Sequence, residues 1–162
     1  GYVHLDNELL PVAPFMYFLP PTEIPGITAA DALDANDQFG ALFRLRLPAT
    51  YCTIMQALYH DLDNEGTGIE LWLFSQRVTL AASDAAFALI DSDNLNVIAP
   101  PLTFSAFKTA TNNQIGVTVD TPVDVFCPGR NLYMAVKTLS TPNIAALNQP
   151  RISMFVRRNN EV

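Results

Sequence analysis

Short stretches in which apolar and polar residues alternate recur along the chain from residue 43 to near its end. Residues 43–47, Phe-Arg-Leu-Arg-Leu, place three apolar side chains on one face and two arginines on the other. Residues 114–120 and 151–157 repeat this period of two. Such alternation is typical of antiparallel strands that have one face buried and one face in water.

Two other stretches, 51–59 and 69–74, are apolar on both faces, which is typical of central strands. The residues between them are rich in Asp, Asn and Gly and favour a turn, so the pair is predicted to form a hairpin with a long loop. Further strands are expected at 95–99, 102–109, 123–127 and 132–137.

Residues 83–90 are the one segment with helical character. Ser83 suits the N-cap position and Asp84 suits the first turn. The whole pattern predicts eight or nine short strands and one short helix. The predicted fold class is therefore all-β, an antiparallel β-sandwich, and long connections such as 75–94 favour a jelly-roll or Greek-key topology.

The N-terminal segment has a different character, because residues 11–26 are apolar and hold five of the chain's twelve prolines. Prolines exclude a regular helix or a central strand. We therefore expect residues 1–38 to form an extended N-terminal arm and linker, and residues 39–162 to form the sandwich. The apolar side chains predicted to bind a partner are those of Phe15, Met16, Tyr17, Phe18, Leu19 and Ile24.

Composition adds that charged residues are only 15% of the chain, against 49% apolar residues. Either other subunits cover much of the surface, or the chain is a small acidic β-domain with a Thr, Asn and Ser surface. A net charge of −7 and nine scattered basic residues argue against a nucleic-acid partner. No stretch approaches the about 20 apolar residues of a membrane span, so no membrane partner is expected. The first residues lack the features of a signal peptide, which predicts synthesis in the cytoplasm.

One acidic motif deserves weighing as a metal site. Asp61, Asp63 and Glu65, followed by Gly66, match the start of a calcium-binding loop. The twelfth position of such a loop needs a Glu, but this chain has Trp72 there, so the EF-hand interpretation fails. A looser calcium site and a solvated hairpin loop both remain, and the second is the simpler interpretation.

Catalytic motifs are missing from the sequence. His60 beside Asp61 could form a base and its orienting acid, but no nucleophile elbow accompanies them. Glycine-rich phosphate loops and zinc-type spacings are also missing. We therefore expect no enzymatic activity and no cofactor. Cys52 and Cys127 lie in predicted strands, where they are either buried free thiols or one disulfide between strands.

Aromatic residues offer an alternative function, since sugar-binding β-sandwiches stack sugars on exposed rings. Trp72 and Phe74 share one strand face, and Tyr51 and Tyr59 share another. Leucines on both sides of Trp72 indicate that its ring is buried. A carbohydrate-binding module therefore stays an alternative rather than the leading interpretation.

The run from residue 39 to residue 158 resembles the head decoration, or cement, proteins of tailed bacteriophages. The resemblance rests on strand and turn phrases, not on a catalytic signature. These phrases are Leu42-Phe43-Arg44-Leu45, Ala57-Leu58-Tyr59-His60-Asp61-Leu62-Asp63-Asn64-Glu65-Gly66, Ile69-Glu70-Leu71-Trp72-Leu73-Phe74, Ala82-Ser83-Asp84-Ala85-Ala86-Phe87, Asp91-Ser92-Asp93, Asn131-Leu132-Tyr133-Met134-Ala135-Val136 and Ile152-Ser153-Met154-Phe155-Val156.

The resemblance implies a structural virion protein without enzymatic activity. Such a protein would bind the major capsid protein on the outer surface of the capsid and stabilise the particle. It would be made in the host cytoplasm and act as a homotrimer or a dimer. A tail or neck component of the virion is the alternative within the same class.

Overall fold

The computed structural model describes residues 9–27, 33–65, 68–142 and 149–159, and this part of the chain is all-β, as predicted. It has ten antiparallel strands and one helix of a single turn, α1 (Asp91–Asn94). The strands are β1 (Leu10–Ala13), β2 (Met16–Glu23), β3 (Phe43–Arg46), β4 (Tyr51–Asp61), β5 (Ile69–Phe74), β6 (Leu102–Ala110), β7 (Asn113–Thr118), β8 (Val123–Phe126), β9 (Asn131–Thr138) and β10 (Arg151–Arg158).

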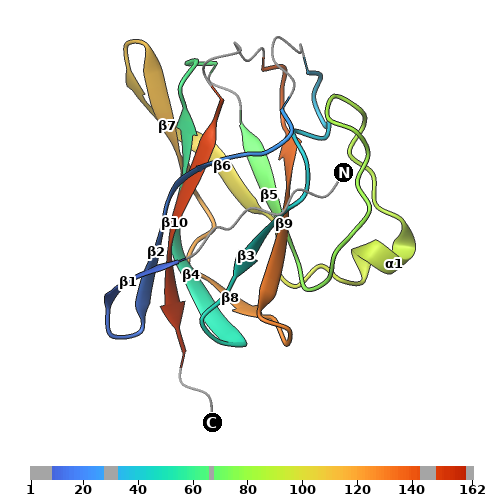
Figure 1. Ribbon diagram of the computed structural model, residues 1–162. Coiled ribbons are helices and arrows are strands. Elements are labelled where there is room, and N and C mark those ends of the chain that lie inside the picture. Colours follow the sequence, from blue (N-terminus) through green and yellow to red (C-terminus); the bar gives the residue numbers. More distant parts are fainter. Residues whose placement is uncertain (1–8, 28–32, 66–67, 143–148, 160–162) are drawn as a thin grey trace.

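All ten strands belong to one hydrogen-bonded sheet that folds over on itself (Figure 1). The order is β1-β2-β10-β4-β7-β6-β5-β9-β3, with β8 also paired to β4. Strand β6 makes the fold-over, because its first residues pair with β5 and the rest pair with β7 across a bulge after Phe104. Bulges bend a strand and increase its twist. We call β1-β2-β10-β4-β7 with β8 the first layer, and β5-β9-β3 the second.

The hydrophobic core lies between these layers and takes one face of each. Ile54 and Tyr59 of β4 and Ile152 of β10 enter it from the first layer, and Leu71 and Met134 enter it from the second. The alternation in the sequence correctly predicted which side chains of 43–47 and 151–157 turn toward the core, although the outward-facing Ser153 is also buried. In 114–120 the expectation that the apolar side chains face inward was wrong, because Ile115 and Val117 lie on the outer face and the alternate residues of β7 are buried. This alternation leaves the other side chains of every strand on the two outer faces.

The N-terminal segment is part of the sandwich over its described residues, which corrects the prediction of a separate arm. Strand β2 lies between β1 and β10 and is antiparallel to both. Leu19 and Ile24 are each only 2% exposed because they fill the core, so they are not available to bind a partner. Pro20 and Pro21 lie where the register between β2 and β10 shifts, a position that tolerates a missing N–H donor.

A close backbone contact also ties this segment to residue 40. The N–H of Ala41 donates to the carbonyl of Pro25 at 2.8 Å. Gly40 has a φ of +79°, and a Cβ there would come within 2.4 Å of the same carbonyl oxygen. Only glycine accepts this approach and this conformation. A domain boundary at residue 38 therefore does not separate the two parts.

The predicted helix at 83–90 was wrong. Residues 83–84 form a turn in which Asp84 has a φ of +73°, and the residues after it pair with 36–38: the N–H of Gln38 donates to Ala85 and the N–H of Phe87 donates to Asn36. Burial alternates with period two along 83–90, so alternate side chains, including those of Phe87 and Leu89, turn toward the sheet. The actual helix follows at Asp91. The strand predicted at 95–99 is reduced to one bridge between Val97 and Phe74.

Candidate functional site

The acidic motif at the end of β4 stabilises a turn. The Asp61 carboxylate is buried and accepts from Gln114 Nε2 at 2.7 Å, from the N–H of Glu65 at 2.8 Å and from the N–H of Asp63 at 3.1 Å. Within the described residues, no group of three or more His, Cys, Asp or Glu side chains is placed to hold a metal ion. This geometry favours the hairpin-loop interpretation of Asp61, Asp63 and Glu65 over a calcium site.

His60 and Asp61, which the sequence offered as a possible base and orienting acid, are not arranged as such a pair, because neighbouring residues of a strand point to opposite faces. Its Nε2 instead lies 2.8 Å from the Ser153 hydroxyl on β10. Partial burial, and then the nearby Arg151 charge, lower the pKa of His60 from its usual 6.5. Ser153 is only 4% exposed, which leaves its hydroxyl little access to a substrate.

Cys52 and Cys127 are both buried and both free, so the disulfide alternative is not formed. Each sulfur lies near a backbone carbonyl: Cys127 Sγ is 3.1 Å from the oxygen of Asn131, and Cys52 Sγ is 3.4 Å from that of Ala49. Burial raises the pKa of the Cys127 thiol, which keeps it protonated and poorly nucleophilic.

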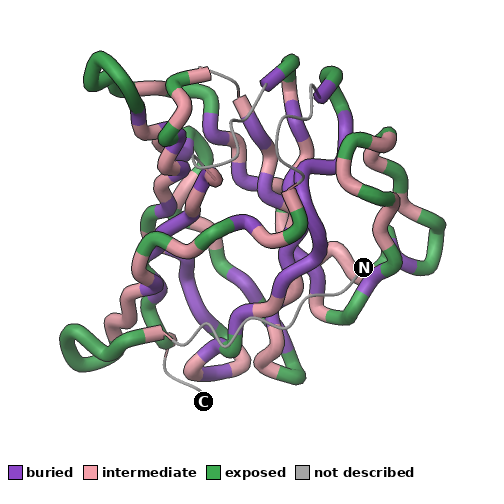
Figure 2. The backbone as a smooth tube through the Cα atoms, turned by 45° about the horizontal axis from the view of Figure 1, so that its top comes forward, coloured by how far each residue is buried: buried purple, intermediate pink, exposed green. Residues whose placement is uncertain are grey.

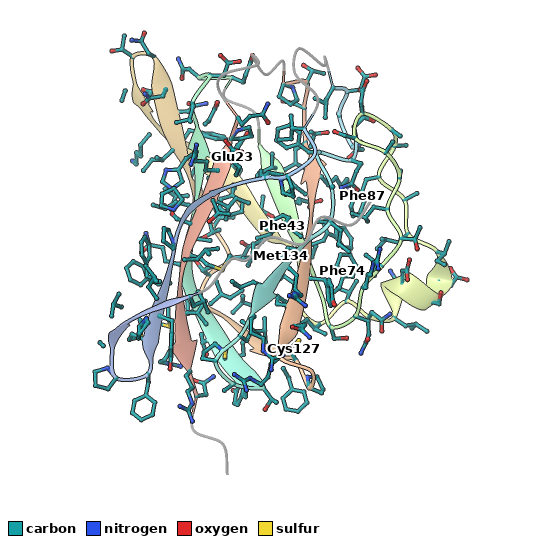
Figure 3. The ribbon with its side chains drawn as sticks, viewed as in Figure 1. Glu23, Phe43, Phe74, Phe87, Cys127 and Met134 are labelled. Atoms are coloured by element: carbon teal, nitrogen blue, oxygen red, sulfur yellow. The ribbon has the colours of Figure 1, made fainter. Side chains whose placement is uncertain are left out.

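The outer face of the second layer is covered by the chain itself. Residues 75–101 cross it, and Figure 3 shows Phe74 of β5 and Phe87 of this segment on the side of β9 away from the core. The Trp72 and Phe87 rings lie 5.2 Å apart between centroids. Since Phe87 packs against the Trp72 ring, this aromatic pair does not form the exposed platform that sugar binding needs. A second cluster results, made of Leu42, Phe74, Val78 and Ala135 with Trp72, Leu80, Phe87, Leu89, Val97 and Tyr133 around it.

The outer face of the first layer carries a row of apolar side chains that crosses its strands. Residues paired across antiparallel strands point to the same side. Leu10 pairs with Phe18 and Phe18 with Phe155, while Leu58 pairs with Val117. Between β4 and β10, Phe155 pairs with Gln56, and Leu58 pairs with Ser153. We give the name apolar band to six apolar residues of this face that follow one another across the strands: Leu10, Phe18, Leu58, Ala106, Val117 and Phe155.

Polar residues border the apolar band on both sides. On one side Arg151 pairs with Glu23 through an Nη2–Oε1 contact of 3.3 Å, and His60 lies next along the row. On the other side Thr53 accepts from Arg157 Nη2 at 3.3 Å and donates to Asp124 at 2.6 Å. The face therefore has an apolar centre with a polar rim.

Within the apolar band there is a dimple of about 30 Å³. The Phe18 and Phe155 rings line the dimple, with their centroids 4.9 Å apart. The rest of its lining comes from Leu58, Gln56 and Ser153 and from their neighbours on β4 and β10. Figure 2 shows that the layer ends in two exposed hairpins, β1–β2 and β6–β7, at its opposite corners. Over the described residues, no segment comparable to 75–101 crosses this face (Figure 1).

The residues predicted to bind a partner are divided by this geometry. Phe18 belongs to the apolar band, Met16 lies on the same face at its rim, and Phe15 is 51% exposed at the tip of the β1–β2 hairpin. Tyr17 points to the opposite side of β2. The sequence interpretation missed Phe155, although the alternation of 151–157 places it in the same outward row as Ser153.

No family model matches the chain, and neither a curated protein nor a solved structure matches it. Among the described residues, no helix is long and apolar enough to cross a membrane.

Proposed function

We propose that this protein is a structural virion component that binds the outer surface of a bacteriophage capsid through the apolar band. One observation supports the proposal: within the described residues, a segment of the chain covers the outer face of the second layer, but none covers the apolar row on the outer face of the first layer. A contiguous apolar patch with a polar rim is the usual arrangement at protein–protein interfaces.

The shape of the apolar band, which is nearly flat and held by paired strands, suits the surface of a folded protein better than a small ligand. Its side chains lie on six adjacent strands, β1, β2, β10, β4, β7 and β6, and the pairing of these strands fixes the spacing of the side chains. The dimple between Phe18 and Leu58, about 30 Å³, has room for a methyl-sized group, whereas small-molecule pockets measure about 300–1,000 Å³. A partner would place a small apolar side chain between Phe18 and Leu58 and lie flat over the rest.

The choice of a capsid rests on the resemblance to decoration proteins. Its phrases correspond to β3, β4, β5, β9 and β10, and the last of them contains Phe155. The partner is then the major capsid protein, and copies of this chain associate as trimers or dimers around the capsid's local axes. The low content of charged residues agrees with a surface that is partly covered in the assembly.

The test compares binding to phage heads by surface variants of matched chemistry. Phe155→Glu and Leu10→Glu place a charge in the apolar band, and Leu95→Glu places one at an 83% exposed leucine beside α1. Cosedimentation with heads of the phage that encodes the chain is expected to weaken at least about tenfold for the first two variants and to stay unchanged for the third. Equal binding by all three would remove the apolar band from the proposal.

Imaging of the particle tests the location separately. Electron microscopy of virions is expected to show the protein on the outer surface of the head. Density at the tail or neck would assign the chain to the alternative virion role, and no density on any particle would refute the capsid proposal. Light scattering on the purified protein distinguishes a trimer, a dimer and a monomer.

A further inference from the structure

A cleft of about 190 Å³ opens between the β1–β2 hairpin and the end of β3, and two arginines line it. Arg46 is the last residue of β3, and Arg130 lies in the turn between β8 and β9. The remaining walls are Tyr17, Leu9, Leu47 and Pro48. Tyr17 and Phe18 are neighbours on β2 and point to opposite faces, so this cleft is separate from the apolar band.

A set of reciprocal hydrogen bonds holds the two arginines in place. Arg46 Nη1 donates to the carbonyl of Gly129 at 2.8 Å and to Asn131 Oδ1 at 3.3 Å. Arg130 Nε donates to the carbonyl of Leu47 at 3.1 Å, while the N–H of Leu47 donates to the carbonyl of Arg130 at 2.7 Å. Both guanidinium groups are therefore positioned before any ligand arrives.

These bonds leave donors unused on both guanidiniums. Neither Arg46 nor Arg130 is paired with a carboxylate of the described residues, and each donates only to neutral oxygens there. The chain has 16 acidic residues against 9 basic ones, so two arginines beside one cleft without an acidic partner are unexpected on composition alone.

The backbone of Arg130 is a second, independent observation. Its φ of +58° lies in the left-handed region, which costs a non-glycine residue free energy. Glycine would adopt this conformation without strain. The chain instead has arginine here, directly after Gly129, and this conformation is the one in which the Arg130 side chain lines the cleft.

We infer that the Arg46–Arg130 cleft binds a carboxylate group that carries a short apolar stem. A guanidinium offers paired N–H donors that match a carboxylate, and charge-assisted bonds of this type are the strongest class of hydrogen bond. Leu9, Leu47, Pro48 and the Tyr17 ring provide apolar walls for the stem. The carboxylate comes either from a small organic acid or from an acidic side chain of a protein. This site is additional to the proposed capsid binding.

Arginine side-chain NMR tests the inference directly on the full chain. The ¹⁵Nε–¹Hε signals are followed at constant ionic strength while sodium glutarate, inorganic phosphate, sodium chloride or the peptide N-acetyl-Gly-Glu-Gly-amide is added. Glutarate is expected to give saturable shifts. Arg46→Gln and Arg130→Gly are each expected to weaken its binding at least about tenfold. Arg130→Gly loses the hydrogen bond to the carbonyl of Leu47 but also removes the strained φ, so this variant is expected to stay folded, and circular dichroism checks this.

The matched control is Lys108→Gln, which removes an exposed cation from the β6–β7 hairpin and is expected to leave binding unchanged. Tighter binding of the peptide than of glutarate would identify a protein side chain as the ligand, and the reverse would identify a free organic acid. Unsaturable shifts, shifts that persist in both arginine variants, or equally tight binding of phosphate or chloride would overturn the inference.

Discussion

The two outer faces of this sandwich begin with similar chemistry and end differently. Each presents large apolar side chains: Trp72 and Phe74 from one strand, β5, on the second layer, and Phe18 and Phe155 from the adjacent strands β2 and β10 on the first. The chain covers the former with residues 75–101, which add Phe87 and Leu89 to a second cluster. It leaves the latter bordered by polar residues. Over the described residues, only the second face has a cover of this kind, and the proposed binding of a partner rests on this difference.

The two faces also treat charge differently. Lys137 and Glu70 form an ion pair of 3.4 Å on the covered face, where both side chains are mostly buried. Arg151 and Glu23 form one of 3.3 Å at the rim of the apolar band, where both are about half exposed. A rim pair of this kind stays hydrated and can exchange its partner for one on another protein, which suits the border of an interface.

The largest effect is expected from removing the hairpin that carries the start of the apolar band. Deleting residues 1–25 removes Leu19 and Ile24 from the core and leaves β10 without its neighbour β2. Each lost side chain costs about 2–5 kcal/mol, against a total stability of about 5–15 kcal/mol for a typical domain. Circular dichroism is expected to show an unfolded or aggregated chain. A folded truncated domain would show that the hairpin is a separate arm.

The next largest effect is expected when a phenylalanine on each of the two faces is replaced by alanine. Phe74→Ala empties a fully buried position in the covered cluster and is expected to cost about 3–5 kcal/mol of the free energy of unfolding. Phe155→Ala on the open face loses one ring contact and is expected to cost about 1 kcal/mol. Urea denaturation of both variants gives the ratio directly. Equal costs would mean that the apolar band is as well covered as the other face.

The sequence predicted the strands where apolar and polar residues alternate, because a period of two needs nothing beyond the local pattern, although in β7 the apolar Ile115 and Val117 face outward and not inward as expected. Residues 43–47 and 151–157 are examples, with the correct side chains turned inward. The segments that it predicted wrongly take their structure from distant partners. Residues 83–90 have the local pattern of a helix, but their pairing with 36–38 determines their structure. The prolines of β2 predicted an arm, but the register shift beside β10 accommodates them within the sheet.

The candidate sites follow the same division. Phe18 was found from the sequence because it lies in an apolar run, whereas Phe155, Leu58 and Val117 share its outer face only because of the register of four strands. The Arg46–Arg130 cleft joins residues 84 positions apart, and no local pattern marks such a pair. The sequence did offer one signal for the apolar band: Phe155 is an aromatic residue among the outward-facing positions of a predicted strand.

A smaller effect is expected from the ion pairs of the two faces. Double-mutant cycles with Lys137→Met and Glu70→Gln, and with Arg151→Met and Glu23→Gln, isolate the coupling in each pair. The rim pair is expected to contribute no more than about 0.5 kcal/mol, since exposed pairs are hydrated and screened, and the covered pair about 1 kcal/mol. A stronger coupling at the rim, measured by thermal unfolding in low salt, would contradict the view that the rim is open to water.

The smallest effect is a pH dependence at His60, on the rim of the apolar band. Its pKa is lower in the folded chain than in the unfolded chain, so the unfolded state binds the proton more readily. The contribution is therefore fully present above the unfolded value of 6.5 and is lost as the pH falls through the lowered folded value. His60→Gln keeps a donor and an acceptor near Ser153 and removes this titration. Between about pH 7.5 and 5.5, where few carboxylates titrate, the urea midpoint of the parent chain is expected to fall more steeply than that of the variant. If the urea midpoints of the parent chain and the variant fell equally steeply with pH, His60 would be as hydrated in the folded chain as in the unfolded one. The partial burial of His60 at the rim of the apolar band would then be contradicted.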